Sequence, residues 1–144
     1  MADQILVPVD GSTSSLDALR FACETFPDAE LVVLHVTDPL DGGSYTALTG
    51  TDSTELRAET TQESDEVASI LSAARDVAGK AGCEIVTETL SGRVPHTIAA
   101  VADERDIDHV VMGSQGREGA GQRLLGSVAE RVVRRAPVPV TVVR

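Results

Sequence analysis

The chain has 144 residues, a mean hydropathy near zero and a formal net charge of −11, from 23 acidic and 12 basic side chains. This length fits one domain with a substantial core, and no apolar run approaches the roughly 20 residues that span a bilayer. Binding to nucleic acid or to anionic membranes requires a positive surface, so the charge argues against both kinds of partner.

The acidic excess has two interpretations. In the first, the charge only keeps the protein soluble. In the second, it is a halophilic adaptation to a high-salt cytosol, where a Debye length of about 3 Å makes self-repulsion tolerable. The segment 1–7 lacks the basic region and the cleavage site of a secretory signal, so we expect a cytoplasmic protein.

Short apolar segments alternate with helical patterns along the chain. We expect strands at residues 5–9, 31–36, 84–90, 109–112 and 137–143. Helical periodicity lies between them, in stretches that begin near Ser12, after Leu56, near Pro95 and at Gly126-Ser127. This alternation predicts one α/β domain over residues 1–144, with a central parallel sheet.

Two of the expected strands have features of sheet edges. The segment 84–90 alternates apolar and polar residues, and Pro137 and Pro139 cannot donate hydrogen bonds to a neighbouring strand. An apolar edge strand can pair with a second copy of the chain. We therefore expect a homodimer through residues 138–143.

Two further features have less definite interpretations. The polar segment 37–56 is longer than the usual ~12–15 residues of a connection, so we expect a mobile or functional loop there. Cys23 and Cys83 follow no metal or redox spacing, and we expect both to be buried, reduced packing residues.

The most informative stretch runs from Val110 to Ser127. It begins as an apolar segment, breaks at Gly113, crosses a glycine-rich loop and resumes helical periodicity at Gly126-Ser127. Glycines bring backbone N–H groups close to an anion, and a helix that begins at Ser127 adds a partial positive charge. The stretch therefore predicts a phosphate cradle made of backbone. The alternative is a flexible surface connection.

Ligands of open parallel sheets bind outside the carboxyl ends of the strands. The residues expected there are 9–11, 36–38 and 112–114. Asp10 is suited to accept hydrogen bonds from a ribose or a base, while the glycine loop holds phosphates. A helix-capping or turn role is the alternative for Asp10.

Several enzyme classes lack their required residues. A P-loop needs Gly-Lys-Ser/Thr, yet the only lysine is Lys80; a dinucleotide fingerprint should follow the first strand, where only Asp10-Gly11-Ser12 is found. A receiver domain would need an acidic pair near the first strand and a late lysine, and no Gly-x-Ser-x-Gly elbow exists. We therefore assign no catalytic residue.

The remaining polar side chains give weaker signals. No metal-ligand spacing is visible, and we expect the isolated histidines to be structural; they are His35, His96 and His109. Arg117 or Arg123 is placed to reach a terminal phosphate, although solvated surface charge is the commoner role of such residues.

Three segments together resemble the universal stress protein family. They are the spacing Gly113-x2-Gly116-x9-Gly126-Ser127, the opening residues 5–12 and the closing residues 124–140. The resemblance covers the whole chain as a single-domain member. It implies a doubly wound, Rossmann-like fold of the adenine nucleotide alpha hydrolase type, with five parallel strands in the order 3-2-1-4-5 and helices on both faces. It also implies a homodimer through the last strand and an ATP site.

The resemblance assigns roles to individual residues. Pro8, Val9 and Asp10 would contact adenine or ribose, and Val36 would flank the adenine. The residues that would wrap the ribose and phosphates are Met112, Gly113, Gly116, Gly126, Ser127 and Val128. A divalent ion such as Mg²⁺ or Mn²⁺ would be held through the phosphates and not by protein ligands. Gln115 occupies a position where relatives often carry a basic residue.

These residues and the resemblance predict an ATP-binding regulator of the stress response, with weak or no hydrolysis, because no general base or positioned lysine is evident. One alternative is a slow ATPase or phosphotransferase that uses Asp10 and a bound metal. Another is a dimeric scaffold whose nucleotide site is unused.

Overall fold

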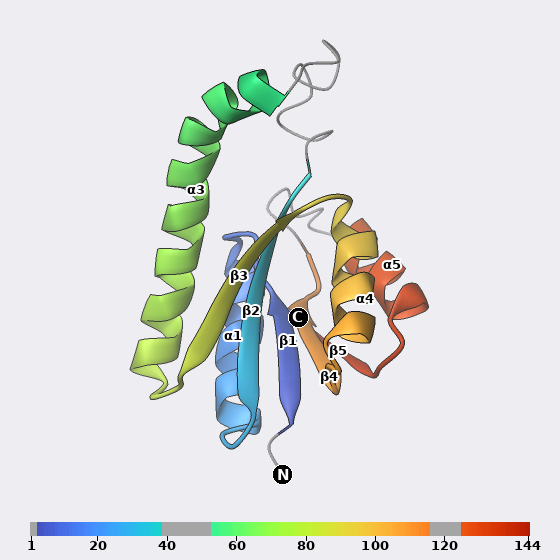
Figure 1. The fold of residues 1–144 in the computed structure, drawn as a ribbon. Coiled ribbons are helices and arrows are strands. Elements are labelled where there is room, and N and C mark those ends of the chain that lie inside the picture. The colour runs from blue at the N-terminus through green and yellow to red at the C-terminus, as the bar shows by residue number, and fades with distance from the viewer. Residues whose placement is uncertain (1–2, 39–52, 116–124) are drawn as a thin grey trace.

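The computed structural model describes residues 3–38, 53–115 and 125–144, and for residues 53–64 it describes the backbone alone. Within these ranges, five parallel strands form one sheet in the order β3-β2-β1-β4-β5 (Figure 1). The strands are β1 (Gln4–Pro8), β2 (Glu30–Thr37), β3 (Ile85–Ser91), β4 (His109–Gly113) and β5 (Val140–Val143). The predicted fold class and strand order are confirmed, as are the edge positions of β3 and β5.

Helices cover both faces of the sheet (Figure 1). The described helices are α1 (Thr13–Thr25), α3 (Ser53–Lys80), α4 (Val94–Glu104) and α5 (Ser127–Arg135). Side chains of β1 alternate between the faces: Ile5 and Val7 pack with α1 and α3, whereas Leu6 packs with α4 and α5. The result is a three-layer α/β/α domain with an apolar core on each side of the sheet.

Local sequence explains where the helices begin. Ser12 has an extended backbone, and its hydroxyl accepts a hydrogen bond from the Ser15 N–H at 3.1 Å, which caps α1. Pro95 lies in the first turn of α4, where its missing N–H would have no partner in the helix. Among the described helices, none is both long and apolar enough to cross a membrane.

Three predicted boundaries differ from the structure. The last strand begins at Val140 and not at Pro137, because proline lacks the N–H of a ladder; Pro139 instead accepts a hydrogen bond from the Val110 N–H. β1 ends at Pro8, although the Val9 N–H still donates to the Leu34 carbonyl at 2.8 Å. Helix α3 begins at Ser53, inside the predicted loop 37–56, of which residues 39–52 lie outside the described ranges.

Candidate functional site

The turn between β1 and α1 is held by short-range hydrogen bonds. The Asp10 carboxylate accepts from the Ser12 N–H at 2.9 Å, and the Asp10 N–H donates to the Ser15 hydroxyl at 3.3 Å. Gly11 has a φ of +86°, which side-chain-bearing residues rarely adopt. The structure thus gives Asp10 the turn role that the sequence left open beside ligand contact.

His35 links the neighbouring strand β2 to this turn. Its Nδ1 lies 2.9 Å from the carbonyl oxygen of Val9, and since a carbonyl only accepts, Nδ1 carries the proton in this bond. Val9 itself is buried in the core between the sheet and α1. The histidine therefore fixes the backbone immediately before Asp10.

The amino end of α1 also contacts the start of the glycine-rich segment. The Gln115 N–H donates to the Ser14 hydroxyl at 3.3 Å. Gly113 lies directly against Ser14, since a Cβ built on the glycine would be 2.6 Å from the Ser14 carbonyl carbon. Gly113 therefore allows α1 and β4 to approach each other closely, a role that the sequence interpretation did not give it.

A backbone clasp joins the two ends of the glycine-rich segment. The Gly126 N–H donates to the Ser114 carbonyl at 2.6 Å, and the Ser114 N–H donates to the Val143 carbonyl at 2.9 Å. The clasp places the beginning of α5 beside the carboxyl end of β4. Gly116, the remaining glycine of the predicted motif, lies outside the described residues.

The first turn of α5 lies beside the carboxyl end of β4. Gly126 is its N-cap residue, and in the described part of the chain no side chain caps the helix. Uncapped N–H groups at a helix beginning attract anions. Glu130 adds negative charge to the same turn, but its carboxylate pairs with Arg134 at 3.2 Å.

Apart from Val9, the apolar residues of the predicted site gather on the α4/α5 side of the sheet. Val36 and Met112 belong to that core, where they are 9% and 5% exposed, and Val128 packs against it half-buried. Strand alternation places Pro8 on the same side as Leu6. These side chains form an apolar wall beside the polar β1–α1 turn.

The structure thus brings nine of the ten predicted residues together at one end of the sheet, at or beside the carboxyl ends of β1, β2 and β4. The exception is Gly116, which lies outside the described residues. Sequence reasoning placed Ser114 at this end within the segment 112–114, but it gave Ser14 and His35 no role there. No spacing rule marks these two residues. Of the two, only His35 lies directly beside a residue of the predicted site, Val36.

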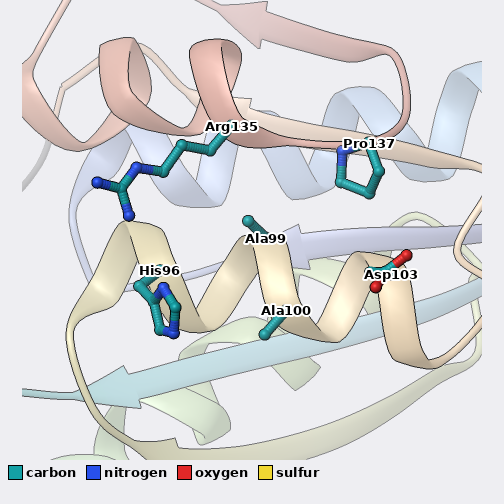
Figure 2. Close-up of a pocket in the computed structure, with 6 residues that line it drawn as sticks. All are labelled: His96, Ala99, Ala100, Asp103, Arg135 and Pro137. Atoms are coloured by element: carbon teal, nitrogen blue, oxygen red, sulfur yellow. The ribbon is translucent and has the colours of Figure 1, made fainter.

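A separate groove lies between α4 and the end of α5 (Figure 2). It has a volume of about 400 Å³, and its lining includes His96, Asp103 and Arg135. None of the predicted site residues lines this groove.

His109, in β4, lies outside both the predicted site and the groove. Its Nε2 shares a hydrogen bond with the Thr141 hydroxyl at 2.7 Å, as expected of a structural histidine.

Comparisons with known proteins agree with this architecture. A family model described as the universal stress protein family matches residues 1–144. Universal stress protein MJ0531 of Methanocaldococcus jannaschii is 36% identical over 143 residues, which cover 98% of this chain and 81% of the relative.

Nucleotide complexes are among the similar solved structures. A universal stress protein in complex with cAMP is 26% identical with a TM-score of 0.70, over 99% of this chain and 97% of that one. The universal stress protein from Archaeoglobus fulgidus in complex with dAMP is 25% identical with a TM-score of 0.66, over 100% and 98%. The chain therefore belongs to the universal stress protein family.

Proposed function

We propose that this protein binds an adenine nucleotide, with ATP as the preferred ligand, and acts as a nucleotide-dependent cytoplasmic regulator of the stress response. The observation that carries the proposal is the Ser114–Gly126 clasp, which sets the uncapped beginning of α5 beside the carboxyl end of β4, where β4 contacts the first turn of α1. The cAMP and dAMP complexes of the two structural relatives support an adenine nucleotide as the ligand class.

The proposed binding mode divides the ligand between two surfaces. The base and ribose lie by Pro8, Val9, Asp10 and Val36, against the apolar wall that Met112 and Val128 continue. The phosphates lie over the backbone N–H groups of Gly126 and Ser127, with Gly113, at the end of β4, and Gly116 as further phosphate-binding residues. A divalent ion such as Mg²⁺ would enter with the phosphates and neutralise part of their charge.

We further propose that hydrolysis is weak or absent. Lys80 is the only lysine of the chain. It ends α3 near the amino end of β3, whereas the proposed site lies at the carboxyl ends of the strands. Phosphoryl transfer relies on positioned positive groups around the transferred phosphate. Along the described residues, no group of three or more acidic, histidine or cysteine side chains could hold a metal ion.

The second part of the proposal is a homodimer through β5. Val140–Val143 form an edge strand whose outer side has no partner strand in the described sheet. An edge of this kind can pair with the same edge of a second copy. Sedimentation of the purified protein at micromolar concentration tests this, and a monomer would contradict it.

A charge substitution at Ser127 tests the phosphate site. Ser127→Asp places a carboxylate in the first turn of α5, which favours the helix but repels phosphates. Ser127→Asn is the matched neutral control. Calorimetry should show ATP affinity at least about tenfold weaker for the aspartate variant, as expected for about 1.4 kcal/mol of repulsion, with adenosine affinity unchanged. Equal ATP binding by all three proteins would contradict the proposed site.

Released ligand gives an independent check. Denaturing extraction of the purified protein, followed by mass spectrometry, should recover adenine nucleotide. ADP that accumulates with time in the bound fraction would favour a slow ATPase. A protein that neither retains nucleotide nor binds ATP at millimolar concentration would leave a dimeric scaffold.

A further inference from the structure

Two cysteines from distant parts of the sequence meet in the core on the α1/α3 side. Cys23 lies near the end of α1 and is 5% exposed, while Cys83 lies half-buried in the turn between α3 and β3. Both pack with the same apolar cluster, and both are free thiols. The expectation of buried, reduced packing residues is therefore confirmed for Cys23, whereas Cys83 is a reduced packing residue that is only half-buried.

The two thiols are also neighbours within this cluster, since Cys83 is one of the groups that perturb the Cys23 thiol. The Cys83 thiol itself donates to the Glu84 carbonyl oxygen at 3.8 Å. Burial, and after it the nearby Cys83 and Glu24 side chains, raise the pKa of Cys23 to about 12. Cys23 therefore stays protonated at neutral pH, and Cys83 is the thiol that solvent reaches first.

We propose that Cys23 and Cys83 form a reversible intrachain disulfide when hydrogen peroxide oxidises the protein. In the first step the Cys83 sulfur attacks a peroxide oxygen, so an S–O bond forms, the O–O bond breaks and one water leaves. In the second step the Cys23 sulfur attacks the Cys83 sulfenic acid, so the S–S bond forms, the S–O bond breaks and a second water carries away the thiol proton. Two thiols lose two electrons, and one hydrogen peroxide becomes two waters.

The position of the pair defines what the disulfide would join. α1 ends near Cys23 and β3 begins just after Cys83, so the bond would lie by the amino ends of the strands. The predicted nucleotide crevice lies at the carboxyl ends, by the other end of α1. The cross-link would enclose β2 and α3 in one covalent loop, and this inference does not depend on nucleotide binding.

The chain contains only these two cysteines, which makes the test direct. The full-length protein is treated with a small excess of hydrogen peroxide and then examined by thiol titration under denaturing conditions, intact mass and non-reducing peptide mapping. We expect both thiols to disappear together and the mass to fall by two hydrogen atoms. A peptide that links residues 23 and 83 should appear in monomeric protein, and dithiothreitol should reverse the change.

Two single variants assign the order of the steps. In Cys23→Ser, Cys83 should be trapped as a sulfenic acid by dimedone and then oxidise further. In Cys83→Ser, the remaining buried thiol should react at least about tenfold more slowly than Cys83 does in the first variant. The melting temperature should rise on oxidation of the native chain and of neither variant.

Other results would overturn the proposal. Addition of oxygen to Cys83 of the native chain without a cross-link would show that the two sulfurs cannot reach bonding geometry. Disulfides that form only between molecules would also show that Cys23 and Cys83 of one chain cannot reach bonding geometry. Both readouts use the native sequence, so they hold even if a serine variant fails to fold.

Discussion

Gly113 at the end of β4 and Ser14 in the first turn of α1 are in direct backbone contact. A Cβ on Gly113 would collide with the Ser14 hydroxyl and would lie 2.7 Å from the Ser14 carbonyl oxygen. Side chains essentially never approach a backbone so closely, so a larger residue would force α1 away from β4. The glycine is thus required by the packing of the fold, whether or not a nucleotide is bound.

Gly113→Ala should therefore destabilise the protein without any ligand present. We expect a loss of about 1–3 kcal/mol in the free energy of unfolding, as for other overpacked sites. Urea unfolding measures it. Gly79→Ala is the matched control, because a Cβ there meets nothing within 4 Å and alanine favours a helix. If both variants are as stable as the native chain, the close contact between Gly113 and Ser14 does not restrict the residue at position 113.

His35→Leu should destabilise the β1–α1 turn, because the Val9 carbonyl would lose the donor that now lies 2.9 Å away. An unpaired buried acceptor costs about 1–3 kcal/mol. His35→Asn places an amide N–H near the position of Nδ1 and should recover most of the loss. Urea unfolding and amide exchange of residues 9–12 measure the effect, and equal losses in both variants would show that the bond does not matter.

Cys23 should make the protein less stable at high pH. Burial and the neighbouring Cys83 raise the pKa of its thiol from 9.0 to about 12. Below pH 9 the thiol is protonated in both states and contributes no pH dependence. Above pH 9 the unfolded chain loses this proton while the folded chain keeps it, so stability falls by up to about 1.4 kcal/mol per pH unit.

The comparison that isolates this effect is Cys23→Ala, followed by urea unfolding from pH 8 to pH 11 under reducing conditions. The other titrating groups are common to both proteins. The native chain should show the steeper decline above pH 9. Parallel pH profiles would mean that the folded protein releases the Cys23 proton as readily as the unfolded one.

The net charge of −11 should make stability depend on salt. The Debye length falls from about 10 Å at 0.1 M to about 3 Å at 1 M, so added KCl screens the repulsion. We expect the melting temperature to rise over this range, as the halophilic interpretation requires. A variant with exposed Asp28, Asp76 and Glu104 as amides should melt higher at low salt and respond less to KCl. A salt-independent native chain would leave only the solubility interpretation.

Much of the fold could be predicted from the sequence, because its local and its long-range requirements agree. An apolar run such as 31–36 indicates a strand with both faces buried. Such strands are typical of a parallel sheet that is covered by helices on both sides. Ser12 and the pair Gly126-Ser127 marked helix beginnings through backbone chemistry that acts within a few residues. The strand order came from the family resemblance, since periodicity does not say which strands are neighbours.

The sequence could not show contacts between elements that are distant along the chain. Nothing in the spacing of Cys23 and Cys83 places them together; the parallel pairing of β2 with β3 and the packing of α3 do so. The same holds for Ser14, which meets Gly113 only because α1 packs on β4. Proline chemistry was known from the sequence, yet the last strand was predicted too long because its valines favoured β structure equally throughout.

The hydrogen bond between Gly126 and Ser114 has a consequence for evolution. It holds the two ends of the intervening segment together, so the framework does not depend on how many residues that segment contains. Doubling the length of such a closed loop costs only about 0.6 kcal/mol of closure entropy. Descendants of this chain could therefore exchange the segment for longer or differently charged versions, and so acquire new ligand preferences while the strands and helices around it stay unchanged.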